Sequence, residues 1–204
     1  GDHRTAIECA TKGLETADQL GALPLFAVLF RTLGNQHTAL GHYEQALEWH
    51  SRGLDLARQL KSRSEEAQSL HQLAVVHIHM GDFDRGRSLL DQALEIHLSL
   101  KAFHDVSSVY NAYGHIHASK KEPEEALRYF KQALEIVEEH QYHHALANVL
   151  SNMSSTLTQL GRYDEAEAIL QRMDAMNDLY AGPIRVRRMT RAKLAEARGN
   201  FEEA

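Results

Sequence analysis

The stretch that decides the fold covers positions 81–96 and reads Gly81-Asp-Phe-Asp-Arg-Gly-Arg-Ser-Leu-Leu-Asp-Gln-Ala-Leu-Glu-Ile96. The pattern occurs earlier in the chain as Gly41-His-Tyr-Glu-Gln-Ala-Leu-Glu-Trp-His-Ser-Arg-Gly-Leu-Asp-Leu56 and later as Lys121-Glu-Pro-Glu-Glu-Ala-Leu-Arg-Tyr-Phe-Lys-Gln-Ala-Leu-Glu-Ile136. It returns at Gly161-Arg-Tyr-Asp-Glu-Ala166, and the chain opens on it at Gly1-Asp-His-Arg-Thr-Ala6. The copies start at evenly spaced positions, and a constant step of this size predicts stacked supersecondary units in place of one globular core.

Each repeat is predicted to contain two helices, because apolar residues recur at spacings of three and four in both halves. Gly41, Gly81 and Gly161 stand between the halves, where helices end, and no sustained β-strand alternation occurs. We call the helix before each of these turns helix A and the helix after it helix B. The predicted helices cover about residues 2–20, 24–39, 42–60, 64–79, 82–100, 104–119, 122–140, 142–159, 162–178 and 183–197.

One position of helix B holds only small residues, which are Ala6, Ala46, Gly86, Ala126 and Ala166. A small side chain there lets helix A approach closely. A large one should overpack the hairpin and cost about 1–3 kcal/mol of stability.

These features resemble the tetratricopeptide repeat, whose pattern is Trp-x2-Leu-Gly-x2-Tyr followed by Ala-x3-Phe. The family repeat is usually about 34 residues long, so this chain is similar to a longer-repeat subgroup found in kinesin-light-chain-like and bacterial regulatory proteins. The resemblance implies an all-α, right-handed α-solenoid of antiparallel hairpins. In helix A, the first half of the motif reads Phe30-x2-Leu33-Gly34-x2-His37, Leu70-x2-Leu73-Ala74-x2-His77, Tyr110-x2-Tyr113-Gly114-x2-His117 and Leu150-x2-Met153-Ser154-x2-Leu157. In helix B, the second half reads Ala46-x3-His50, Gly86-x3-Leu90, Ala126-x3-Phe130 and Ala166-x3-Leu170.

We expect one array over residues 1–204, in which both ends fall inside a repeat. A chain cut in this way would come from a longer protein, and it could associate with itself through ends that leave Ile7, Ala10, Leu14 and Leu20 uncovered. The predicted units are 1–22 (a helix B), the repeats 23–61, 62–101, 102–141 and 142–181, and a truncated repeat at 182–204.

The composition excludes several classes of protein. A formal charge of −6 disfavours a nucleic-acid binder, and no apolar run is long enough for a membrane span. One cysteine, Cys9, fits a reducing compartment, so we expect a cytoplasmic protein; we expect its side chain to be a small core residue. No phosphate-binding glycine loop or nucleophile elbow occurs, which predicts neither an enzyme nor a cofactor.

Charged residues are missing from most of helix A in each repeat. Residues 67–81, 106–119 and 142–160 contain no Asp, Glu, Lys or Arg, and residues 25–41 contain only Arg31. One explanation is that these helices are buried between two neighbours. They also carry many amides and histidines, however, and unpartnered buried amides cost about 1–3 kcal/mol each, which favours a water-filled groove.

The resemblance implies that the A helices line a concave groove that binds a protein or peptide. The predicted lining is Arg31, Asn35, His71, Asn111, His115, Asn148, Ser151, Asn152 and Ser155. Arg31 with Asn35 is similar to the start of the family's clamp for a terminal carboxylate, but the later clamp positions hold Ser108 and Ala112.

Two further groups of residues have competing interpretations. His37, His77 and His117 stand at the motif's Tyr position and are expected to be packed aromatics, because His-x-His pairs on a helix point apart and predict no metal site. Arg185, Arg188 and Arg191 form either a solvated basic face or a docking surface for an acidic partner or for a neighbouring domain of a longer protein.

The function predicted from these features is a non-catalytic protein- or peptide-binding scaffold. The alternative is a sensory or regulatory module that controls an attached effector domain when a ligand fills the groove.

Overall fold

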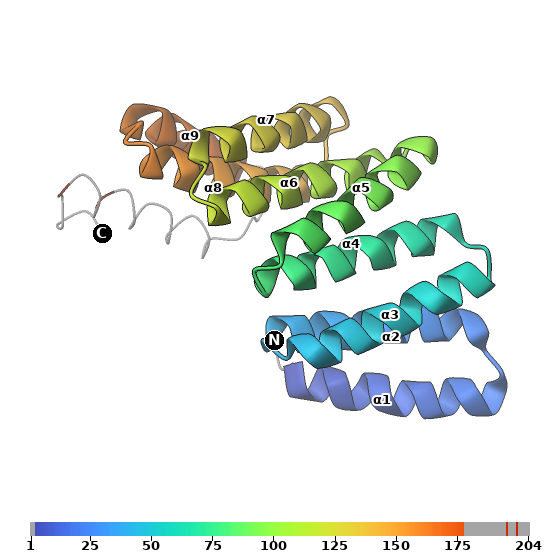
Figure 1. Ribbon diagram of the computed structural model, residues 1–204. Coiled ribbons are helices and arrows are strands. Elements are labelled where there is room, and N and C mark those ends of the chain that lie inside the picture. Colours follow the sequence, from blue (N-terminus) through green and yellow to red (C-terminus); the bar gives the residue numbers. More distant parts are fainter. Residues whose placement is uncertain (1–2, 178–194, 196–198, 200–204) are drawn as a thin grey trace. The chain divides into compact units, whose positions relative to one another are not determined.

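The computed structural model describes residues 3–177, together with Ala195 and Gly199. Every regular element in these residues is an α-helix, and no strand occurs among them (Figure 1). The chain divides into two compact units, which we call unit 1 (residues 1–102) and unit 2 (residues 103–204).

Unit 1 contains α1 (His3–Leu20), α2 (Leu23–Ala39), α3 (Tyr43–Gln59), α4 (Arg63–His79) and α5 (Phe83–Ser99). Each of these helices packs on the next one along the chain, and α2 also contacts α4. The unit is therefore a stack of antiparallel hairpins in which helices α2 and α4 are the predicted A helices.

Unit 2 repeats this arrangement with α6 (Phe103–Ser119), α7 (Pro123–Glu139), α8 (His143–Gln159) and α9 (Tyr163–Asn177). Here α6 and α8 are the A helices, and they also contact one another. The predicted helices up to residue 178 are confirmed, with small differences at their ends. The helix predicted at 183–197 lies outside the described residues.

The turns explain why the helices end where they do. In the turn after α2, the Gly41 N–H bonds to the Thr38 carbonyl at 3.0 Å and the His42 N–H bonds to the His37 carbonyl at 2.9 Å. This pairing closes the helix with one residue in the left-handed region, and Gly41 has φ 76°. Lys121, which holds this position in the third copy, has the same left-handed conformation, and so do Lys61, Lys101 and Gln141 in the turns after helix B. The glycine pattern did not indicate that residues with a side chain adopt it.

The small-residue position of helix B is buried in α3, α5, α7 and α9, whereas Ala6 in α1 is half-buried. Ala46, Ala126 and Ala166 have no exposed surface. A Cβ added to Gly86 would lie 2.8 Å from Ile78 Cγ1 and 3.3 Å from the Ala74 carbonyl oxygen, which shows how closely the two helices approach.

Two expectations for α1 are wrong. Ala10 was expected to be uncovered but is buried, because α1 packs against α2. Leu20, at the end of α1, is 71 % exposed, as expected. Cys9 is exposed and is not part of the core. No helix in the described part of the chain is long and apolar enough to cross a membrane.

Candidate functional site

The predicted groove residues are divided between the two units. Unit 1 holds three of them on α2 and α4, and unit 2 holds six on α6 and α8. The continuous groove along all four A helices therefore stays a prediction, and each unit is described by itself. Those in unit 1 are Arg31, Asn35 and His71, and those in unit 2 are Asn111, His115, Asn148, Ser151, Asn152 and Ser155.

None of these nine side chains is buried. Asn35, His115 and Asn148 are exposed, and the other six are half-buried. The A helices do bury apolar residues between their neighbours, including Leu70, Val109 and Leu150. Burial between neighbours therefore accounts for the apolar faces of α4, α6 and α8, whereas α2 leaves Leu23, Leu25 and Val28 exposed. The predicted amides and histidines lie where water or a ligand reaches them.

Unit 2 holds a hydrogen-bonded network on this polar face. Asn152 Nδ2 on α8 donates to Asn111 Oδ1 on α6 at 2.8 Å, and the same nitrogen lies 3.2 Å from His115 Nε2. An amide nitrogen only donates, so His115 accepts through Nε2 and its ring proton is on Nδ1. The His115 ring also meets Phe130 edge to face, with 5.6 Å between centroids. Three side chains from two helices are thus held in fixed positions at the surface.

Unit 1 has a charged pair in the corresponding place. Arg31 Nη1 on α2 lies 3.4 Å from Glu65 Oε2 on α4 and also donates to Gln68 Oε1. Sequence reasoning missed Glu65, because it stands in the charged first turn of α4, before the charge-free stretch begins. A terminal carboxylate approaching Arg31 would have to compete with Glu65, which disfavours the clamp.

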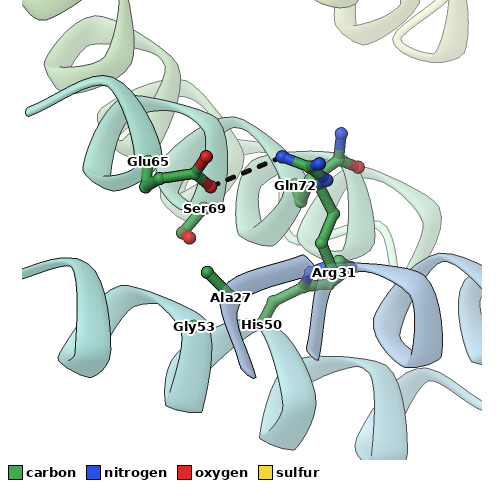
Figure 2. A pocket seen from close by; sticks show the side chains of 7 residues that line it. All are labelled: Ala27, Arg31, His50, Gly53, Glu65, Ser69 and Gln72. Carbon is green, nitrogen blue, oxygen red and sulfur yellow. Dashed lines mark hydrogen bonds and ion pairs between the residues drawn. The ribbon is translucent and has the colours of Figure 1, made fainter. Parts of the chain in front are cut away.

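A small pocket opens beside this pair (Figure 2). Ala27 and Arg31 of α2 face Glu65, Ser69 and Gln72 of α4 across it, and His50 and Gly53 of α3 complete the lining. The helix B residues His50 and Gly53 were not among the predicted site residues. The available indication was a histidine at the position that the motif reserves for Phe.

His50 is only 2 % exposed, and its Nε2 atom has no hydrogen-bond partner among the described residues. Burial lowers the pKa of His50 from its usual 6.5 to about 4, because the charged imidazolium would lose its hydration. The ring is therefore neutral at pH 7. It packs against Gly34, where an added Cβ would lie 2.4 Å from His50 Cε1.

The three histidines at the motif's Tyr position are half-buried, and His117 is a packed aromatic, as predicted. His117 stacks on Tyr129 with 5.1 Å between ring centroids, and its Nδ1 lies 2.6 Å from Glu122 Oε2. His77 Nδ1 lies 3.6 Å from Asp82 Oδ2. Burial, and then the nearby His42, lower the pKa of His37.

Two other expectations concern metals and the basic face. Among the described residues, no group of three or more His, Cys, Asp and Glu side chains is arranged to hold a metal ion. Arg185, Arg188 and Arg191 lie outside the residues that the structure describes, so the basic docking face stays a prediction.

Comparison with known proteins places this geometry in a family. The model of the tetratricopeptide repeat matches residues 25–99, 65–139 and 105–173. The chain belongs to the tetratricopeptide repeat family. The predicted fold class, an all-helical solenoid of hairpins, is confirmed with it. A search of curated proteins found no match.

Several solved structures share the fold. BtubC (BKLC) from P. vanneervenii is 18 % identical, with a TM-score of 0.76 over 100 % of this chain and 87 % of that chain. A STAND signal-transduction ATPase with a tetratricopeptide repeat sensor, from Pyrococcus horikoshii, is 14 % identical, with a TM-score of 0.70 over 96 % of this chain and 30 % of that chain. The Rap conjugation gene regulator of plasmid pLS20, solved with the Phr* peptide, is 17 % identical, with a TM-score of 0.72 over 95 % of this chain and 59 % of that chain.

Proposed function

We propose that the chain is a non-catalytic binding module whose A helices hold a peptide segment of a partner protein. The observation that carries this proposal is the surface network of Asn111, His115 and Asn152, which is fixed by hydrogen bonds across two helices. Side chains held in this way lose little conformational freedom when they bind a ligand.

The chemistry of the network suits a peptide backbone. Asn152 uses both N–H groups of its amide within the network, which leaves its carbonyl oxygen as an acceptor. Asn111 uses its carbonyl oxygen and keeps its amide N–H groups as donors. A peptide group offers one donor and one acceptor, so it can bond to both side chains. The sequence-specific part of recognition then falls to neighbouring side chains.

Two structural relatives support a peptide ligand. The pLS20 Rap regulator was solved with the Phr* peptide, and a Rap protein with 16 % identity was solved with Competence and Sporulation Factor. Their likeness to this chain concerns the fold, and the polar faces of the A helices supply the independent argument.

The test is selection of peptides from a displayed random library, followed by affinity measurement on variants. The double variant N111A/N148A should weaken binding by roughly 1–3 kcal/mol because two hydrogen-bonding groups are lost. Helical content should stay the same, because Asn148 is exposed and Asn111 is half-buried. Failure to select any peptide, or selected peptides that bind the double variant as tightly as the parent, would refute the proposal.

The matched control comes from helix B of the same unit. Glu135 and Glu139 on α7 are exposed, and replacing both with Ala should leave binding unchanged. Glu138 is a poorer control, because it accepts a hydrogen bond from Arg172 on α9.

A second function, a regulatory module, is favoured by the STAND relative, whose tetratricopeptide repeats are described as a sensor. In that function, peptide binding would alter the activity of a domain attached to this chain in a longer protein. Measuring that activity with and without a selected peptide separates the two functions, since a simple scaffold would show no change.

A further inference from the structure

The hydrogen-bonded network of unit 2 contains one group that can take up a proton. His115 accepts a hydrogen bond from Asn152 Nδ2 through its Nε2 atom at 3.2 Å, and the same amide nitrogen donates to Asn111 Oδ1 at 2.8 Å. A neutral imidazole accepts at one ring nitrogen, whereas an imidazolium donates at both. The network in this structure therefore requires a neutral His115.

Protonation of His115 would bring two donors together. The new Nε2–H would face the amide N–H groups of Asn152, and turning the ring would not help, because both nitrogens of an imidazolium carry a proton. The edge-to-face contact with Phe130 also holds the ring in place. The change that restores the hydrogen bond is a half-turn of the Asn152 amide. Its Oδ1 then takes the place of Nδ2 and accepts from Nε2–H.

This half-turn requires a second one in Asn111. Once Oδ1 of Asn152 takes the place of Nδ2, it faces Asn111 Oδ1, and two acceptors meet at hydrogen-bonding distance. A half-turn of the Asn111 amide brings its Nδ2 to this place, where it donates to Asn152 Oδ1. Both side chains are half-buried and reach the surface. The oxygen and the NH2 group of an amide are similar in size, so neither half-turn needs much additional space.

We infer that protonation of His115 reverses the hydrogen-bonding pattern that unit 2 offers to a peptide. With His115 neutral, Asn111 offers N–H groups and Asn152 offers its carbonyl oxygen. After both half-turns, Asn111 offers the oxygen and Asn152 offers the N–H groups. A peptide bound to the first pattern meets donors with donors and acceptors with acceptors in the second.

The inference rests on the proposed peptide-binding function and adds its regulation by pH. Peptide and proton oppose each other, because each favours a different state of the network. The affinity for the peptide should therefore fall as the pH drops through the titration of His115.

Few other ionisable groups face His115. Residues 106–119 of α6 and the whole of α8 contain no Asp, Glu, Lys or Arg. The helix α7 meets the His115 ring through Phe130, and its charged residues are all exposed. The other histidines and acidic residues of α6 and α8 are His104, Asp105, His117, His143 and His144, and the charged residues of α7 are Glu124, Glu125, Arg128, Lys131, Glu135, Glu138 and Glu139.

The position of His115 also differs between the repeats. Its equivalents in the other A helices are Asn35, Val75 and Ser155, none of which titrates. The reversal is therefore expected in unit 2 alone.

The first test follows the free protein by NMR from about pH 8 to about pH 5, a range that includes the usual histidine pKa of about 6.5. Long-range proton–nitrogen spectra should show the His115 ring proton on Nδ1 at the high-pH end. The side-chain amide signals of Asn111 and Asn152 should shift with the same midpoint as the His115 Cε1–H signal. The nuclear Overhauser contact between that hydrogen and the Asn152 amide protons should disappear on protonation, because the amide protons turn away.

The second test measures the affinity of a peptide selected from the library at about pH 7.5, near the high-pH end of the histidine titration. A peptide without His, Asp or Glu is chosen, so that only the protein titrates. Its dissociation constant should rise by about tenfold or more when His115 is protonated, because two hydrogen bonds give way to mismatched pairs.

Two variants separate His115 from the other histidines. His115→Phe keeps a ring against Phe130 and removes the titrating nitrogens, so the dissociation constant should stay nearly constant over the same pH range. This variant should stay folded, because His115 is exposed. His144→Phe is the matched control, since His144 is an exposed histidine of α8 in the same unit, and it should keep the full pH dependence.

Four results would overturn the inference: a His115 ring proton on Nε2 at high pH, amide signals that do not follow the titration of His115, a dissociation constant that protonation leaves unchanged, or an equal pH dependence in His115→Phe. The NMR titration needs no peptide, so it decides the reversal even if the library selection fails. Selected peptides that depend on Asn111 and Asn148 but not on pH would refute the inference and leave the proposed function standing.

Discussion

His50 in unit 1 and Phe130 in unit 2 occupy the same place in two hairpins and have different consequences. Each ring packs on a glycine of the A helix, since a Cβ on Gly34 would lie 2.4 Å from the His50 ring and one on Gly114 would lie 2.3 Å from the Phe130 ring. Phe130 fills its space with carbon. His50 is desolvated, which holds its pKa at about 4 and leaves Nε2 without a partner among the described residues.

This difference shows that the hairpin accommodates either ring. The residues packed beside the two rings differ. Beside Phe130 the neighbouring positions hold Ala133 and Val149, both buried. Beside His50 they hold Gly53 and Ser69, and a pocket opens there. The two hairpins therefore share a backbone arrangement and differ in the side chains that pack between their helices.

The largest expected effect is that of removing the Phe130 side chain. Phe130→Ala should lower the free energy of unfolding by about 3–5 kcal/mol, because Phe130 is 1 % exposed and its loss leaves a cavity. Chemical denaturation followed by circular dichroism measures this. Trp49, the single tryptophan, reports unit 1 in the same experiment, and its fluorescence transition should shift less than the transition seen by circular dichroism. A smaller effect for Phe130→Ala than for His50→Ala would contradict the comparison.

The next largest effect is a pH dependence that only unit 1 should show at this position. The pKa of His50 is about 4 in the folded chain against 6.5 when exposed, so the unfolded chain binds the proton more tightly. The contribution of His50 to the free energy of unfolding should be constant above about pH 6.5. It should fall by about 1.4 kcal/mol per pH unit as the pH drops from 6.5 to 4, about 3 kcal/mol in total.

His50→Phe should remove most of this loss, and the lowered pKa of His37 should leave a smaller loss of the same sign. The measurement is the Trp49 denaturation midpoint at several pH values. His144→Phe serves as control, because His144 is exposed. An unchanged pH dependence in His50→Phe would show that other groups cause it.

A third prediction compares the two glycines under the rings. Gly114→Ala should destabilise unit 2 by about 1–3 kcal/mol through overpacking, offset in part by the better helix propensity of Ala. Gly34→Ala should cost less, because His50 borders a pocket and can shift, whereas Phe130 is surrounded by buried side chains. Thermal denaturation of both variants measures the two losses of stability. A larger loss for Gly34→Ala than for Gly114→Ala would contradict the expectation that the His50 side chain can shift.

The smallest effects concern the turns from helix A to helix B. Unit 1 has Gly41 and Gly81 at the left-handed position, while unit 2 has Lys121 with φ 61° and Gly161 with φ 71°. Gly161→Ala should cost about 1 kcal/mol, because a Cβ is disfavoured in this conformation. Lys121→Gly should gain less than about 1 kcal/mol, since the added freedom of glycine in the unfolded chain offsets the relieved strain. Melting temperatures that move in the same direction for both variants would contradict this.

Much of the fold was predictable because the repeat marks its own boundaries. The helix predicted at 122–140 is observed at Pro123–Glu139, and the others agree as closely up to residue 177. Turn residues and apolar spacing act locally, so they can be read from one segment at a time. The exposure of Cys9 and the burial of Ala10 were missed, because they depend on how α1 and α2 pack on each other.

The candidate site was predictable in part. The spacing of the motif and the absence of charge indicated polar faces on the A helices, and all nine predicted side chains are at least partly accessible. The bond between Asn111 and Asn152 and the pairing of Arg31 with Glu65 were not predictable, because each joins two different helices that are far apart in the sequence.

The sequence by itself determined the repeat, the helices, their turns and the small residues where two helices meet, since each follows from local spacing and side-chain size. Only the tertiary structure decided that His50, Gly53 and Ser69 meet beside Arg31 and form a pocket. The physical reason is that a pocket is the space left between side chains of separate helices. Its size and polarity depend on how those helices pack, and no single stretch of the chain carries that information.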